Sequence, residues 1–127
     1  MTEIIFKDLS YKLTGIAYKI DNQIGFGHNE KIYSDAFEKI LCDEKLSYKK
    51  EVYSPIKVDG HLIAKRYLDY LVEDLVVVEI KTGLYRYSDV FNQVFEYLKI
   101  NNLKLGLVIR FGKTGVQVKR VINIRNS

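Results

Sequence analysis

The chain has 127 residues, of which 47% are hydrophobic and 28% charged, and it carries a formal net charge of +4. This length suits one domain over residues 1–127, and the composition is that of a globular protein without long disordered linkers. Cys42 is the only cysteine, which excludes an intrachain disulfide and a cysteine-based zinc cluster. No signal peptide and no bilayer-spanning apolar run is visible, so we expect a cytoplasmic location.

The first third of the chain shows helical periodicity. Apolar residues recur at helical spacing over residues 7–22, which predicts the first helix. Glycines in the stretch NQIGFGHNE then interrupt the pattern. Asn29 is the expected N-cap of a second helix that ends near Glu44. Cys42 falls within the apolar pattern of that helix and is expected to be buried.

After the second helix the apolar pattern shifts to a period of two, which is typical of strands. Asp59-Gly60 predicts a tight hairpin turn. A third helix is expected to start at a cap formed by Ser88 or Asp89. The expected order is α-α-β-β-β-α-β-β, an α/β or α+β fold. The expected strands are residues 48–53 with 56–58, 62–72, 75–82, 103–110 and 116–124.

The stretch LDYLVEDLVVVEIK, residues 68–81, contains charged side chains among apolar strand residues. A buried charge costs free energy unless a partner compensates it. Glu79 and Lys81 are two positions apart, so their side chains point to the same face of the strand. Whether Asp69 shares that face depends on the turn between the two strands.

The turn length decides where Asp69 points. A two-residue turn at residues 73–74 would put Asp69 and Glu79 on opposite faces, because directly opposed residues project to the same side. A three-residue loop, either 72–74 or 73–75, puts them on one face. The turn has no Gly or Asn, which disfavours the two-residue type. We therefore expect an odd-length connection that brings the two carboxylates together.

Two neighbouring carboxylates repel each other unless a cation lies between them. Oxygen ligands suit Mg²⁺ or Mn²⁺. Lys81 on the same face could stabilise charge on a phosphate or orient an attacking water, which metal-assisted phosphodiester hydrolysis requires. The alternative is a structural salt bridge in which Asp69 and Glu79 hold Lys81. The spacing of these residues leaves both interpretations open.

Two further stretches add a family resemblance. GHNEKIY, residues 27–33, fits the signature of the GxxExxY protein family, and residues 66–81 resemble that family's central motif. QVFEY, residues 93–97, is similar to the QxxxY element of RecB-like exonucleases. The resemblance extends over residues 9–124. It implies membership of the PD-(D/E)XK nuclease superfamily, with a central mixed sheet flanked by helices and a metal site at one end.

The resemblance also implies a role for each matching residue. Asp69 and Glu79 are implied to bind the metal, together with the backbone carbonyl of Ile80. Lys81 matches the motif lysine. The helix residues that match are Glu30, as a further metal ligand, and Gln93 and Tyr97, as polar side chains lining the site.

The residues themselves also permit structural roles. Glu30 lies in the first helical turn, where a carboxylate favours the helix dipole. Tyr33 and Tyr97 could be core residues whose hydroxyls are hydrogen-bonded. Gln93 is harder to explain structurally, because it interrupts an apolar helix face.

The charge distribution bears on partners. No Asp or Glu occurs from Leu103 to the end, where six Lys and Arg residues form either a face that follows a phosphate backbone or a solvated basic strand pair. The loop at residues 85–87 could stack on bases. The resulting hypothesis is a Mg²⁺- or Mn²⁺-dependent nuclease in DNA repair or defence, with DNA favoured over RNA. The alternative is a nuclease-fold nucleic-acid-binding or protein-interaction module without turnover, acting as a homo-oligomer or with a partner protein.

Overall fold

The structure, a computed structural model, describes residues 4–124. Three helices and seven strands form in these residues. The helices are α1 (Lys7–Ile24), α2 (Glu30–Asp43) and α3 (Tyr87–Ile100). The strands are β1 (Tyr48–Tyr53), β2 (Ile56–Val58), β3 (His61–Ala64), β4 (Tyr67–Val72), β5 (Val76–Thr82), β6 (Leu105–Gly112) and β7 (Gly115–Ile122).

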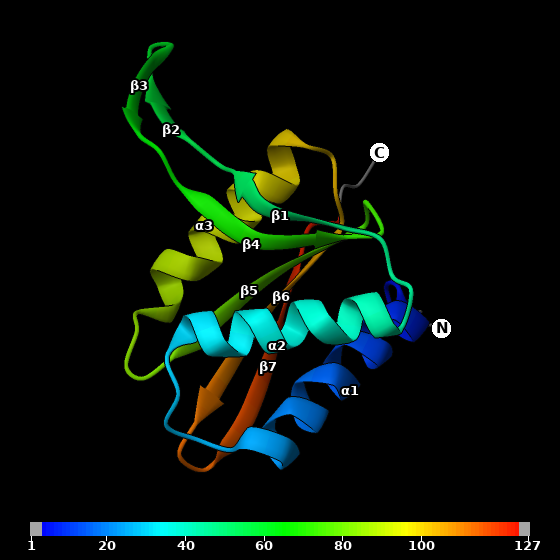
Figure 1. Cartoon of the computed structure of the whole chain (residues 1–127). Coiled ribbons are helices and arrows are strands. Elements are labelled where there is room, and N and C mark those ends of the chain that lie inside the picture. Colours follow the sequence, from blue (N-terminus) through cyan, green and yellow to red (C-terminus); the bar gives the residue numbers. More distant parts are fainter. Residues whose placement is uncertain (1–3, 125–127) are drawn as a thin grey trace.

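Five of the strands form one mixed sheet in the order β1-β4-β5-β6-β7. Only β5 and β6 are parallel, and α3 connects them. Helices α1 and α2 lie on one side of the sheet and α3 on the other, while the β2–β3 hairpin projects away from the body (Figure 1). The expected mixed sheet flanked by helices is therefore confirmed.

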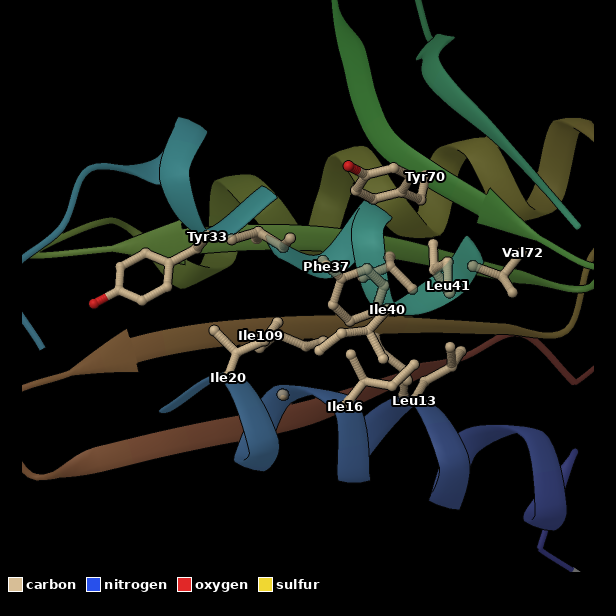
Figure 2. Close-up of a cluster of buried hydrophobic side chains, with 14 of the residues drawn as sticks. Leu13, Ile16, Ile20, Tyr33, Phe37, Ile40, Leu41, Tyr70, Val72 and Ile109 are labelled. Atoms are coloured by element: carbon tan, nitrogen blue, oxygen red, sulfur yellow. The ribbon is translucent and has the colours of Figure 1, made fainter. Parts of the chain in front are cut away.

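Two apolar clusters hold the helices to the sheet. On one side, buried residues of α1 and α2 such as Leu13 and Phe37 pack against Tyr70 and other sheet residues (Figure 2). On the other side, Val94 and Leu98 of α3 pack against a second cluster. Burial of this kind stabilises each helix far more than its intrinsic propensity does. The sheet is covered on both faces, which explains the uninterrupted valines of β5.

The loop before α2 is fixed by an N-cap and a buried tyrosine. The Asn29 side chain accepts a hydrogen bond from the Ile32 N–H at 3.0 Å, which confirms the predicted cap. Tyr33 is fully buried and stacks on Phe111. Its hydroxyl donates to the Gly25 carbonyl and accepts from the His28 N–H. Tyr33 thus holds the loop that leads to Glu30.

The structure corrects three predictions. The expected strand over residues 62–72 is broken at Lys65-Arg66 into β3 and β4, which belong to different sheets. Residues 48–53 and 56–58 likewise form two strands in different sheets, so two more strands exist than the predicted order contains. Helix α3 begins at Tyr87 with Arg86 as N-cap, two to three residues before the predicted caps. Cys42 is exposed, with its thiol 3.3 Å from the Tyr48 hydroxyl.

None of the helices formed by residues 4–124 combines the length and apolar character needed to cross a membrane.

Candidate active site

The predicted carboxylates meet where β4 and β5 separate. The β4–β5 register pairs Val72 with Val76 and Tyr70 with Val78, so the connecting loop is the three-residue alternative at residues 73–75. Continuation of this register would place Asp69 opposite Glu79, but the backbone pairing ends one residue earlier. In Figure 1 the two strands diverge beyond this point, β4 toward the projecting hairpin and β5 toward the loop before α3.

Side chains replace the missing backbone ladder at this position. The Asp69 N–H donates to Glu79 Oε1 at 3.0 Å, and the Ile80 N–H donates to Asp69 Oδ2 at 2.6 Å. Each carboxylate therefore accepts from the backbone of the opposite strand. Such reciprocal bonds fix both carboxyl groups in the gap between the strands and leave the second oxygen atom of each for a further partner.

The neighbouring strand is irregular at the same level. In the β1–β4 register Lys50 pairs with Tyr70 and Val52 with Leu68. The pair expected between them, Glu51 with Asp69, does not form. Glu51, at the missing position, has a left-handed backbone with φ of 53°. A non-glycine residue in this conformation persists only where its surroundings impose it. Asp69 therefore lies in a part of the sheet that is distorted on both sides.

Burial and charge repulsion act on Glu79. Glu79 is only 5% exposed. Desolvation first, and then the nearby Asp69 carboxylate, raise the pKa of Glu79 from 4.5 to about 8. Lys81 opposes this shift, because its Nζ lies 3.6 Å from Glu79 Oε2. Glu79 and Lys81 therefore lie together as predicted. Their contact fits the structural salt bridge, and the repulsion between Glu79 and Asp69 fits a site that binds a cation.

Glu30 reaches the same end of the sheet from α2. Its Oε2 accepts from the Thr82 N–H at 3.3 Å, one residue beyond Lys81. Glu30 and Asp69 line one cavity of about 240 Å³, together with Ser34, Lys50 and other polar residues of α2 and β1. The first turn of α2 thus faces the gap between β4 and β5 across a polar cavity.

The two α3 residues are placed differently from each other. The Gln93 side-chain amide donates to the Tyr67 carbonyl at 3.4 Å, two positions before Asp69. Tyr97, one helical turn further, is 9% exposed and packs in the α3-side cluster. It lines a separate cavity with Ser54 and Pro55. Tyr97 is therefore a core residue of α3 in this arrangement, and burial raises its pKa.

Arg110 is a site neighbour that the motifs did not indicate. It is the direct partner of Lys81 in the parallel β5–β6 register, so both side chains project to the same face. Its Nε donates to the Gly83 carbonyl at 2.9 Å, which fixes the loop that follows Lys81. The β6 sequence LGLVIR, in which one arginine ends an apolar run, was the available signal.

Within residues 103–124 the basic side chains do not form one face, and Arg125 lies outside the described residues. The Arg120 guanidinium donates to Ser10 Oγ at 2.9 Å and to the Ile5 carbonyl at 2.7 Å, so it anchors α1. Lys119 points the other way and lies 4.1 Å from the centre of the Tyr87 ring. Neighbouring strand residues alternate between faces, which separates these charges. Of the two alternatives for this segment, the placement of Arg120 and Lys119 does not support a continuous basic face over residues 103–124.

The donor set fits a hard divalent cation in type. Asp69 and Glu79 offer carboxylate oxygens, and their repulsion would be relieved by a cation between them. Within residues 4–124, however, no three His, Cys, Asp or Glu side chains lie close enough together to hold an ion as they stand. Glu30, the third ligand that the motif match implies, lines the Asp69 cavity together with two other acidic residues, Asp35 and Glu51.

Comparisons with known proteins agree with the fold. A family model described as the PD-(D/E)XK nuclease superfamily matches residues 7–121. The fold is similar to that in the crystal structure of SSO0001, with a TM-score of 0.57 and 18% identity over 76% of this chain and 50% of that one. It is also similar to an alkaline exonuclease from Laribacter hongkongensis, with a TM-score of 0.52 and 10% identity over 98% of this chain and 73% of that one.

The chain thus spans about half the length of SSO0001. No curated protein matches the sequence. The structural likenesses concern the fold, whereas the family model covers nearly the whole chain. The chain belongs to the PD-(D/E)XK nuclease superfamily.

Proposed function

We propose that this protein is a divalent-metal-dependent nuclease that hydrolyses phosphodiester bonds of nucleic acids, with DNA favoured over RNA. The observation that carries the proposal is the carboxylate pair in the gap between β4 and β5, with the Lys81 ammonium 3.6 Å from Glu79. Residues 1–127 act as one nuclease-like domain of the GxxExxY group. Membership of a superfamily whose nucleases generally use divalent metals supports the proposal.

Four groups would hold Mg²⁺ or Mn²⁺. They are the carboxylates of Asp69, Glu79 and Glu30 and the backbone carbonyl of Ile80. When bound, the metal would supply Lewis-acid stabilisation of the phosphate and lower the pKa of a bound water. The raised pKa of Glu79 supports this assignment, because a carboxyl group that is costly to ionise alone gains most from a cation.

Lys81 acts on the substrate, and Gln93 and Tyr97 support the site. Lys81 neutralises the charge that develops on the phosphate and orients the attacking water. Hydrolysis forms a bond from the water oxygen to phosphorus and breaks the bond to O3′, which leaves as the hydroxyl and gives a 5′-phosphate product. Gln93 anchors α3 to β4 beside Asp69, and Tyr97 contributes by fixing α3 in the core.

The first experiment measures metal binding. Calorimetric titration of Mg²⁺ and Mn²⁺ into wild type should give binding, and Asp69→Asn should abolish it. Asn keeps the size of the side chain and an oxygen that can accept from the Ile80 N–H. Absence of binding by wild type would contradict the proposal.

The second experiment measures turnover on labelled single- and double-stranded DNA and RNA. Lys81→Ala should reduce cleavage by at least about a hundredfold, the usual scale for removal of a transition-state electrostatic contact. Lys104→Ala is the control, because Lys104 is exposed and precedes β6 at the opposite end of the sheet. Equal cleavage by wild type and Lys81→Ala would point to a contaminant or to a different site.

A module that binds nucleic acid or a partner protein without turnover is the alternative. The absence of a ready group of three acidic side chains within residues 4–124 favours it. It predicts nucleic-acid binding by wild type with no cleavage at any tested concentration of either metal.

A further inference from the structure

An exposed tyrosine pair lies next to the carboxylates. Tyr53 of β1 and Tyr67 of β4 are direct cross-strand partners. Their ring centres are 5.5 Å apart with an interplanar angle of 51°. The side chains are 45% and 51% exposed, although neighbouring Leu68 is fully buried. Two large aromatic rings thus remain in solvent at the edge of the sheet.

The pair points to the same side as Asp69. Val52 and Leu68 pack into the α3-side cluster, so Tyr53 and Tyr67 project to the opposite face by strand alternation. Asp69 follows Tyr67 by two positions, roughly 7 Å along the strand. It lines a cavity with residues of α2, on the side opposite α3. The rings therefore lie on the Asp69 side of the sheet, outside the lining of that cavity, and Tyr53 also borders the cavity that Tyr97 lines.

Two exposed lysines lie within four positions of the tyrosines along the chain. Lys57 of β2 and Lys65 of the β3–β4 connection are exposed. Arg66 is engaged in holding the backbone, since its Nε donates to the Ser54 carbonyl at 3.2 Å and its Nη2 lies 3.4 Å from Glu96. Exposed aromatic rings beside lysines form the combination that binds single-stranded nucleic acid, because bases stack on the rings and lysines contact phosphates.

We propose that Tyr53 and Tyr67 form a stacking platform for an unpaired base next to the phosphate to be cleaved, so that the substrate is a single strand. This inference rests on the proposed nuclease function. A paired base inside a duplex is stacked on both faces and would have to be extruded before it could use the rings. Single strands offer these faces without that cost, so the platform selects them.

The alternative is that the pair only stabilises the edge of the sheet. Aromatic cross-strand pairs do contribute to sheet stability. That role makes no use of the exposed ring faces and predicts no effect on nucleic-acid affinity in variants that remain folded.

Binding without turnover is the test. Wild type in EDTA is titrated into a fluorescently labelled single-stranded oligonucleotide and into the matching duplex, and anisotropy is recorded. Wild type should bind the single strand more tightly. Tyr67→Ala and Tyr53→Ala should each weaken single-strand affinity about tenfold, the scale of one lost base–aromatic stack. Duplex affinity should stay unchanged.

Matched variants separate stacking from folding. Tyr67→Phe keeps the ring and should retain affinity. Tyr67→Leu keeps apolar bulk without the ring and should lose it, which decides the case if Tyr67→Ala fails to fold. Tyr11→Ala removes a tyrosine that is 81% exposed on α1 and should bind as wild type.

The outcomes distinguish this inference from the nuclease proposal. Wild-type affinity in Tyr67→Leu, or a preference of wild type for the duplex, overturns the platform even if the protein cleaves DNA. Loss of single-strand binding in Tyr67→Leu supports the platform even if wild type with Mg²⁺ or Mn²⁺ cleaves nothing, in which case only the nuclease proposal fails.

Discussion

Burial of Glu79 beside Asp69 makes the charge of this carboxyl depend on pH in the physiological range. In the folded chain its pKa is about 8, against an ordinary value of 4.5. Below pH 4.5 both folded and unfolded chains hold the proton. Between about 4.5 and 8 only the folded chain holds it, so folding stability falls as the pH rises through this window.

Replacement of Glu79 by glutamine should remove this pH dependence. The glutamine side chain stays neutral, and its oxygen can still accept from the Asp69 N–H. Each pH unit within the window is worth at most about 1.4 kcal/mol. The free energy of unfolding is measured with urea in EDTA from about pH 5 to 8.5. Over this range the difference between Glu79→Gln and wild type should shift in favour of the variant by on the order of 3 kcal/mol. Glu44→Gln, an exposed control, should follow wild type. Parallel curves for wild type and Glu79→Gln would disprove the shift.

The Tyr33 hydroxyl contributes to stability through the loop before α2. It donates to the Gly25 carbonyl and accepts from the His28 N–H. Tyr33→Phe keeps the stacked ring and removes both bonds, so the free energy of unfolding in urea should fall by about 1–2 kcal/mol. Tyr18→Phe, on an exposed side chain of α1, serves as control and should change nothing measurable. An unaffected midpoint in Tyr33→Phe would mean that the loop is held by other contacts.

At the residue scale, the sequence predicted some features of the site and missed others. The approach of Asp69 to Glu79 followed from alternation and an odd-length loop, which are local properties of the chain. The left-handed backbone of Glu51 and the tie between Arg110 and Gly83 depend on strands distant in sequence. No local pattern encodes such contacts. Tyr97 was matched by a short motif, whereas its burial depends on how α3 meets the sheet.

Helix α3 approaches the sheet closely at Gly106. A Cβ added to this residue would lie 2.4 Å from Cγ1 of Val94. The valine side chain is stiff and cannot move away easily. Gly106 therefore sets how near α3, and with it Gln93, lies to β6.

A double-mutant cycle tests this contact. Gly106→Ala should destabilise the protein by about 1–3 kcal/mol in urea unfolding, as overpacked core positions do. Val94→Ala should cost less stability in the Gly106→Ala background than in wild type, because it removes the side chain that the added Cβ meets. Gly15→Ala is the control, since an added Cβ there meets no atom within 4 Å. Strict additivity of the two core substitutions would argue against a direct clash.

The elements themselves were mostly predictable, with one instructive exception. Periodicity located all three helices, and Asp59-Gly60 closes the β2–β3 hairpin as a two-residue turn. The break at Lys65-Arg66 lacks Gly or Pro. It arises because the Ser54 N–H donates to the Arg66 carbonyl and Arg66 Nε donates back to the Ser54 carbonyl, a tertiary contact.

The whole molecule concentrates its site features at one end of the sheet. The carboxyl ends of β5 and β6 carry Lys81 and Arg110, and the first turn of α2 brings Glu30 to the same end. Lys113 follows β6 there, in the turn before β7. For nucleic-acid binding, the positions of the basic side chains are therefore more informative than the net charge of +4. Arg120 and Lys119 are committed to α1 and to Tyr87.

This distribution predicts a moderate salt dependence of single-strand binding. Lys81 is paired with Glu79 in the metal-free protein, and the other cations placed to contact phosphates are Arg110 and Lys113 at the site end, and Lys57 and Lys65 near the tyrosine pair. For about four contacts the slope of log affinity against log salt is expected to be about −3. The double variant Lys57→Ala/Lys65→Ala removes two of these contacts and should make the slope shallower by about 1.4. Lys104→Ala, at the far end, should leave it unchanged. A slope near zero, or one that Lys104→Ala alters as much as the double variant does, would contradict binding at the site end of the sheet.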